Sequence, residues 1–327
     1  MKHGSLILLA GLFVSVARAQ PAEPLRQIAT IALPNVAGRI DHLAFDADRQ
    51  RLFIAALGND TVEVVDAAAN VHLRSLPEFH EPQGIAVAPE FGALAVANGE
   101  TGTLQLLDAQ TFATRWTVAV GGDADNVRYD AAAKQLYAAA TGGLYRVDPG
   151  AGKVVGRIPI DGHPESFQLE TGGRRVFANL PGILSSQVVV GDRERGEAAA
   201  RWSSIGCRSN YPMALDEATM RVLIGCRLPA RLVMLDSRSG EVKTAVDVVG
   251  DTDDLFFDAA RQRVYVVGGE GFVDVLRRRG DALERIARLP TRAGARTGLW
   301  VAATSRLYVA VPARDDQGAE ARVFEAE

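Results

Sequence analysis

The sequence lacks the short motifs that usually mark a reaction. No Cys-x-x-Cys-His, His-Glu-x-x-His, Walker loop or Gly-x-Ser-x-Gly elbow occurs, which excludes the common haem-attachment, zinc-peptidase, nucleotide-binding and esterase signatures. A basic surface is missing too, because the formal net charge is −4, and this argues against a nucleic-acid partner. Beyond the N-terminus no apolar stretch approaches membrane length, and no low-complexity linker divides the chain.

The one apolar stretch, Leu6 to Ala17, is typical of an export signal. It follows a short basic start and is too short to span a bilayer, which needs roughly 20 residues. Ala17-Arg18-Ala19 supplies the small residues of a cleavage site, and no Cys follows that could carry a lipid anchor. We therefore expect cleavage of residues 1–19 near Ala19. The single domain of residues 20–327 would then be periplasmic or secreted, without membrane insertion.

A short apolar pattern recurs seven times along the rest of the chain. Its copies begin at Arg51, Ala93, Gln135, Arg175, Arg221, Arg263 and Arg306. A regular spacing of roughly 40 residues indicates a repeat architecture. β-Branched and aromatic residues between frequent turn signals favour short strands over helices. The pattern predicts seven units that start near residues 39, 81, 123, 163, 209, 251 and 295.

Each unit contains four short strands, and the third often ends in Asp, as in residues 62–66 and 104–108. The last unit has no fourth strand of its own. Residues 27–31 have the character of a fourth strand without a unit, and adding them to the last unit would cover an unpaired edge. We therefore expect an all-β, seven-bladed β-propeller with four antiparallel strands per blade, closed by the N-terminal strand.

The repeat resembles a known family. Arg306-Leu307-Tyr308-Val309-Ala310 and Thr61-Val62-Glu63-Val64-Val65-Asp66 are similar to the YVTN β-propeller repeat of exported bacterial proteins. The resemblance covers nearly all of residues 25–327. It departs from the pattern at an insertion near Pro181–Ser186 and at Arg277-Arg278-Arg279, which replaces a strand-terminal Asp. It implies the fold but no reaction, because propellers host binding modules, lactonases, lyases and haem enzymes alike.

Propeller geometry places the residues that enter each first strand around the mouth of the central channel. Aligning the copies predicts an outer level of Asp41, Gln83, Asp125, Glu165, Tyr211, Asp253 and Thr297, and a next level of His42, Gly84, Asn126, Ser166, Pro212, Asp254 and Gly298. Carboxylates crowded at one level repel unless they are protonated, screened or paired with a cation. These acids are therefore either hydrated groups in a water-filled channel or parts of a ligand site.

Three histidines fall on segments that we expect at the mouth: His42, His80 and His163. With Glu81 and Glu165 beside them in sequence, they could bind a metal or supply a general base. Copper, zinc and calcium are the divalent metals considered. The alternative is that these are ordinary surface or hydrogen-bonded histidines, because they come from three different blades.

Basic residues and both cysteines belong to the same face. Arg39, Arg227 and Arg296 could hold a carboxylate or sugar acid through bidentate bonds, or each could simply neutralise a neighbouring Asp. Cys207 and Cys226 lie near one end of the same predicted hairpin. An oxidising compartment favours a disulfide between them, and a thiolate metal site that includes His163 is the alternative.

These patterns lead to two hypotheses for the function. The first is a non-catalytic binding or scaffold protein that presents its acidic mouth to a small molecule, a metal ion or a protein partner. Its candidate ligand-binding residues are Arg39, Asp41, Asp125, Asn126, Glu165, Arg227, Asp253, Asp254 and Arg296. The second is a lactonase- or lyase-like enzyme, with His42 or His163 as the base, Tyr211 as the acid, and Arg227 and Arg296 as a carboxylate clamp.

Overall fold

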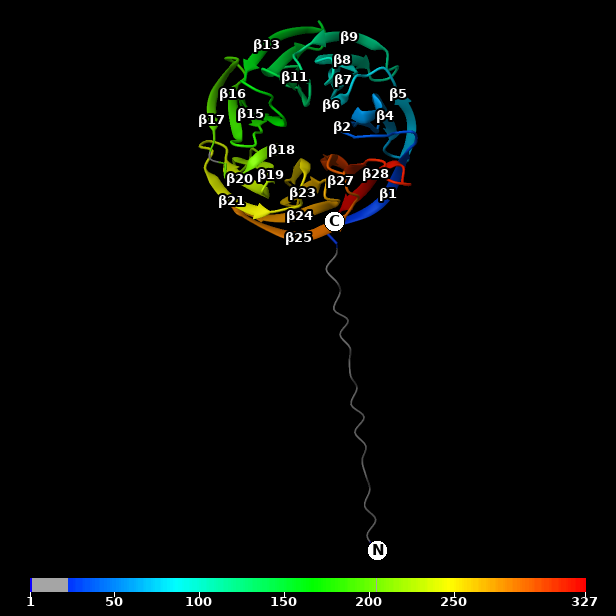
Figure 1. Ribbon diagram of the computed structural model, residues 1–327, viewed down its shortest axis with the longest axis vertical. Helices are drawn as coiled ribbons and strands as arrows, with labels where there is room; N and C mark the ends of the chain where they lie inside the picture. Colours follow the sequence, from blue (N-terminus) through cyan, green and yellow to red (C-terminus); the bar gives the residue numbers. More distant parts are fainter. Residues whose placement is uncertain (2–22, 204) are drawn as a thin grey trace.

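Seven four-stranded antiparallel sheets stand around a central channel, as the view down the channel shows (Figure 1). This computed structural model describes residues 1, 23–203 and 205–327. The expected export signal, residues 1–19, lies outside the described residues except for Met1. Among the described residues, no helix is long and apolar enough to cross a membrane. The all-β, seven-bladed architecture expected from the repeat is confirmed.

The first six blades each use four consecutive strands, the first nearest the channel and the fourth at the rim (Figure 1). Blade 1 comprises β2 (Leu43–Asp46), β3 (Arg51–Ala56), β4 (Thr61–Asp66) and β5 (Val71–Leu76). Blade 2 comprises β6 (Pro82–Ala88), β7 (Ala93–Asn98), β8 (Thr103–Asp108) and β9 (Thr114–Ala119). Blade 3 comprises β10 (Val127–Asp130), β11 (Gln135–Ala140), β12 (Gly143–Asp148) and β13 (Lys153–Pro159).

The second half of the ring repeats this order. Blade 4 comprises β14 (Phe167–Leu169), β15 (Arg175–Leu180), β16 (Gln187–Asp192) and β17 (Glu197–Trp202). Blade 5 comprises β18 (Arg208–Asp216), β19 (Arg221–Leu228), β20 (Ala230–Asp236) and β21 (Val242–Asp247), and blade 6 comprises β22 (Thr252–Asp258), β23 (Arg263–Gly268), β24 (Phe272–Arg279) and β25 (Ala282–Pro290). Blade 7 contains β26 (Gly298–Val301), β27 (Arg306–Val311) and β28 (Ala319–Ala326). Single 3-10 turns occur at Leu57–Asn59, Pro89–Phe91 and Ala302–Thr304.

The N-terminal strand closes the ring, as expected. Strand β1 (Leu25–Leu33) pairs antiparallel with β28, from Leu25 opposite Ala326 to Leu33 opposite Ala319. It is longer at both ends than the predicted residues 27–31. Because β1 completes blade 7, the edge of β28 is paired and does not face solvent. The pairing of β1 with β28 therefore closes the ring.

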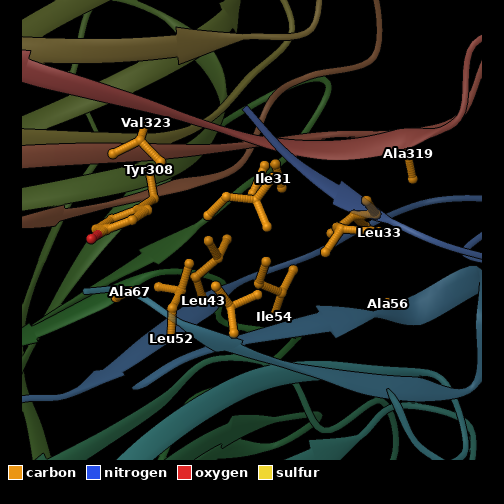
Figure 2. Packing of buried hydrophobic residues seen from close by; sticks show 14 of the residues in the cluster. Ile31, Leu33, Leu43, Leu52, Ile54, Ala56, Ala67, Tyr308, Ala319 and Val323 are labelled. Carbon is orange, nitrogen blue, oxygen red and sulfur yellow. The ribbon is translucent and has the colours of Figure 1, made fainter. Parts of the chain in front are cut away.

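Apolar packets between neighbouring blades form the core. Between blades 7 and 1, Ile31 and Leu33 of β1 pack with Leu52 and Ile54 of β3 and with Tyr308 of β27 (Figure 2). Each middle strand is covered on both faces by adjacent blades, which explains why the second strands are apolar along nearly their whole length. The outermost strands instead alternate toward solvent.

The Asp residues that end many strands stabilise the turns that follow. In blade 2, the Asp108 carboxylate accepts the backbone N–H groups of Gln110 at 2.9 Å and Thr111 at 2.8 Å. The same Asx turn recurs at Asp66, Asp148, Asp192 and Asp236. The recurring Asp noted in the sequence is thus a turn residue of the repeat.

Candidate ligand site in the central channel

Hydrogen bonds between first and second strands fix which residues share a level of the channel. The carbonyl of His42 accepts the N–H of Ala55, and in blade 7 the corresponding carbonyl is that of Thr297, which accepts the N–H of Ala310. Thr297 therefore lies at the level of His42, and Arg296 takes the position at the level of Asp41. The alignment of the seventh copy was wrong by one residue, because its extra residue lies before the first strand.

A polar cavity of about 340 Å³ occupies the mouth of the channel, and we call it the mouth chamber. Its lining contains most of the predicted site residues. The predicted residues present are Arg39, Asp125, His163, Glu165, Tyr211, Arg227, Asp253 and Arg296. Asp41, Asn126 and Asp254 are buried and do not line it. With Glu81 and Gln83 of the second unit, residues from all seven predicted units meet in one space.

His42 links three blades across the channel beneath the mouth chamber. Its Nδ1 lies 3.3 Å from a carboxylate oxygen of Asp254 in blade 6. Its Nε2 lies 2.9 Å from the amide nitrogen of Asn126 in blade 3, 3.5 Å from Asp41 and 3.8 Å from Asp125. Burial alone would lower the pKa of His42, but the carboxylates of Asp254 and Asp41 outweigh it and raise the pKa to about 10. The surrounding carboxylates therefore favour the protonated form of the ring.

The crowded acids avoid repulsion in different ways. Burial raises the pKa of Glu165 well above its usual range, and the nearby Asp125 carboxylate adds to this effect. Burial also acts to raise the pKa of Asp125, but hydrogen bonding to His163 and the charge of His42 bring it down to about 2. For Asp253, burial prevails over the attraction of Arg227 and raises the pKa to about 6. Raised pKa values and pairing with cations both reduce the repulsion between these carboxylates.

The three arginines of the mouth chamber already hold carboxylates of this chain. Arg39 lies 2.7 Å from Asp41. Arg227 lies 2.6 Å from Asp253, and Arg296 lies 3.1 Å from Asp251. Arg227 also stacks on the ring of Tyr211, with its guanidinium carbon 3.8 Å from the ring centroid. These ion pairs match the neutralising role expected for these arginines. To bind an external carboxylate, each arginine would first have to break its ion pair with Asp41, Asp251 or Asp253.

Asp125, His163 and Glu165 form the one compact set of metal-type donors among the described residues. One donor atom from each lies within 4.8 Å of the other two. The Nε2 atom of His163 is 3.7 Å from oxygens of both Asp125 and Glu165. Burial acts to lower the pKa of His163, but the hydrogen bond and the charge of Asp125 raise it. These three side chains could hold a divalent metal ion at the wall of the mouth chamber.

His80 does not join this set. Its side chain is 59% exposed, and its Nδ1 lies 3.5 Å from Glu100 at the outer surface. His42 approaches the Oδ1 atom of Asp125, whereas His163 approaches its Oδ2 atom, and the predicted trio of His42, His80 and His163 does not form one donor set. Sequence position alone placed His80 at the correct face but could not show which way its side chain turns.

Cys207 and Cys226 are joined by a disulfide, with their Cα atoms 6.1 Å apart. They lie in or beside the hairpin formed by β18 and β19 of blade 5. With both sulfurs in this bond, a thiolate metal site with His163 is not formed in the structure.

A second cavity, which was not predicted from the sequence, lies farther along the channel. This far chamber has a volume of about 720 Å³ and is lined by the middle and end of several first strands, including Phe45, Arg128 and Phe256. His42 and Asp254 also border it, and His42 contacts Asp125 of the mouth chamber, so this cluster lies between the two chambers. Arg128 lies within β10, beyond the entry to the strand, and so was not among the predicted residues. In the sequence, Arg128 lies two positions after Asn126. The equivalent positions of blades 1 and 2 are occupied by Ala44 and Ala86.

Comparisons with known proteins establish the fold but no activity. No family model matches the chain. An uncharacterized protein, YwhL of Bacillus subtilis (strain 168), is 28% identical over 126 residues, which are 38% of this chain and 27% of that protein. The chain therefore spans only about a quarter of the relative's length. The likeness is that of a distant homologue whose own function is undescribed.

Two solved structures have the same fold over nearly the whole chain. A chain of Kuenenia stuttgartiensis hydrazine synthase has a TM-score of 0.75 at 15% identity, covering 91% of this chain and 95% of that one. A chain of a mitotic checkpoint complex also has a TM-score of 0.75, at 12% identity, covering 97% and 98%. These two proteins have different names but share one fold. Function must therefore be argued from the site and not from the fold.

Proposed function

We propose that this protein is an exported binding protein whose mouth chamber holds a divalent metal ion on Asp125, His163 and Glu165. The observation that carries the proposal is the convergence of their donor atoms within 4.8 Å at the wall of a polar cavity. The disulfide between Cys207 and Cys226 supports a location outside the reducing cytoplasm.

The donor set favours zinc or copper over calcium. One imidazole with two carboxylates suits the borderline divalent metals, whereas calcium takes roughly six to eight oxygen ligands. Three protein ligands leave at least one coordination position open. That position would face the mouth chamber, where water or a small anionic ligand could occupy it.

An enzymatic role for the same chamber has weaker support. The lactonase- or lyase-like hypothesis needs Arg227 and Arg296 free to clamp a substrate, but both are paired with Asp251 or Asp253. Burial also raises the pKa of Tyr211, which makes it a weaker acid. We therefore propose binding, and not turnover, as the function of the mouth chamber.

Metal titration of the purified mature protein tests the proposal. We expect one Zn²⁺ per chain by elemental analysis and by isothermal titration calorimetry. His163→Ala and Glu165→Gln should each weaken zinc binding by about 10–100-fold or more, because each removes a ligand from a set of three.

The matched control is His80→Ala, which removes an exposed histidine at the same face. It should leave the zinc affinity unchanged. Absence of stoichiometric zinc, or an equal loss of affinity in His80→Ala and His163→Ala, would contradict the metal site.

A further inference from the structure

The far chamber contains a cation without an acidic partner. Arg128 stands on β10, and its Nη1 donates only to the carbonyl oxygen of the adjacent Val127, at 3.0 Å. Among the described residues, no carboxylate lies within 4.0 Å of its guanidinium, whereas each arginine of the mouth chamber has one. The remaining N–H donors of Arg128 are therefore available to a ligand.

The position of Arg128 is fixed by its surroundings. Its guanidinium carbon lies 5.6 Å from the centre of the Phe167 ring, a cation–π contact that orients the head group. Burial lowers the pKa of Arg128, and the more distant charges of Asp254 and Asp125 only partly offset this. An anion in the chamber would supply the charge that the site lacks at close range.

The other first strands carry apolar or amide side chains at the position equivalent to Arg128. The seven residues that occupy it, one from each first strand, are three alanines, Phe256, Leu299, Gln168 and Arg128. Phe45 and Tyr129 extend the apolar wall of the cavity. Six of the seven positions thus carry no charge, and the single charged one is a cation.

Two acids border the chamber and must be counted. Asp254 is already engaged by His42 at 3.3 Å and by the backbone N–H of Gly298 at 2.9 Å. Glu90 belongs to the 3-10 turn that follows β6. Neither lies within ion-pair distance of Arg128, so the guanidinium remains the group that an anionic head group would meet.

We propose that the far chamber binds a small molecule with a carboxylate head and an apolar body. The carboxylate pairs with the Arg128 guanidinium, which can donate two parallel hydrogen bonds to it. The apolar body lies against Phe45, Phe256 and Leu299. The volume of about 720 Å³ lies within the range of known small-molecule pockets, roughly 300–1,000 Å³. This site is separate from the metal site of the mouth chamber and does not depend on it.

Calorimetric titration of the mature protein with two probes tests this proposal. The probes are decanoate and 3-phenylpropionate, and each is compared with the alcohol of the same carbon skeleton. We expect at least one carboxylate to bind about tenfold more tightly than its alcohol. Arg128→Gln should weaken that carboxylate by about tenfold or more and leave the alcohol nearly unchanged.

A matched control separates this effect from general loss of an arginine. Arg157 also lies over an aromatic ring, that of Tyr145 at 5.7 Å, but stands on β13 at the rim. Arg157→Gln should bind the carboxylate as the unaltered protein does. Val87→Trp is a second variant, for use if Arg128→Gln fails to fold. Val87 lines the far chamber, so a tryptophan there fills it while Arg128 is kept. This variant should abolish probe binding.

Three outcomes would overturn the proposal: neither carboxylate binds, a carboxylate and its alcohol bind equally, or affinity survives both Arg128→Gln and Val87→Trp. Zinc titration of Arg128→Gln keeps the two sites distinguishable. Retained zinc binding with lost carboxylate binding supports two independent sites.

Discussion

The pKa of each acid in the channel depends on its burial and on the charged side chains that contact it. Asp41, Asp125 and Asp253 are identical side chains at one level of the channel. Asp125 has a pKa of about 2, because hydrogen bonding to His163 and the charge of His42 overcome its burial. Asp253 has a pKa of about 6, because burial outweighs Arg227. A repeat that looks uniform in sequence therefore contains acids with different pKa values, so Asp253 takes up a proton at a higher pH than Asp125 does.

The Asx turn at Asp108 should make the stability of the protein depend on pH. Hydrogen bonds from the Thr111 N–H, the Arg115 side chain and the Gln110 N–H hold the pKa of Asp108 well below its usual range. A carboxyl with a lowered folded pKa stabilises the folded state fully above its unfolded pKa of about 3.9 and loses this effect as the pH falls through the folded value. Asp108→Asn should therefore lower the melting temperature at pH 7, and the deficit should shrink below about pH 4.

Differential scanning calorimetry between pH 7 and pH 2 measures this effect. Asp48→Asn is the control, because the Asp48 carboxylate accepts no hydrogen bond from the described residues and is exposed. A deficit of Asp108→Asn that stays constant over the whole pH range would show that its charge is not responsible.

Elements in the propeller depend on their neighbours for stability, and β1 shows this most clearly. It belongs to blade 7 although it is the first strand of the chain. Its buried residues Ile31 and Leu33 pack between blades 7 and 1 (Figure 2), and Leu25 packs between blades 6 and 7. The apolar alternation of the strand could be recognised in the sequence, since burial on one face leaves a period of two.

We predict that Ile31→Ala destabilises the protein by about 2–5 kcal/mol, because Ile31 is only 2% exposed and its loss leaves a cavity at the closure. Thr30→Ala, on the exposed face of the same strand, should change the free energy of unfolding by less than about 0.5 kcal/mol. Guanidinium unfolding measures both. Equal effects would show that β1 does not contribute its inner face to the closure.

At the scale of the whole molecule, the channel joins residues that are far apart in the chain. His42 and Asp254 are separated by 212 residues, and His42 and Asn126 by 84. Their contacts form the boundary between a polar mouth chamber and a largely apolar far chamber. The disc therefore presents two cavities of different chemistry along one axis.

We predict that His42→Ala costs about 3–5 kcal/mol of folding free energy, because it leaves Asp41 and Asp254 buried beside an empty space without their shared cation. His80→Ala, which removes an exposed histidine, should cost less than about 0.5 kcal/mol. Chemical unfolding at pH 7 compares them. A small cost for His42→Ala would show that the buried acids take up protons instead.

The sequence by itself determined the number of blades, the four strands in each and the closure by the N-terminal strand. These features follow from local apolar patterns and a regular spacing, which a linear chain displays directly. It also predicted that several acids, arginines and His163 would share one face, and these side chains line the mouth chamber, because the entry to each first strand is a fixed place in the repeat.

Only the tertiary structure decided which of those side chains meet. The convergence of Asp125 with His163 and Glu165 and the outward turn of His80 depend on side-chain directions that the repeat does not encode. The far chamber around Arg128 arises from seven strands that approach one axis from separate parts of the chain. Its chemistry exists only once the ring is closed.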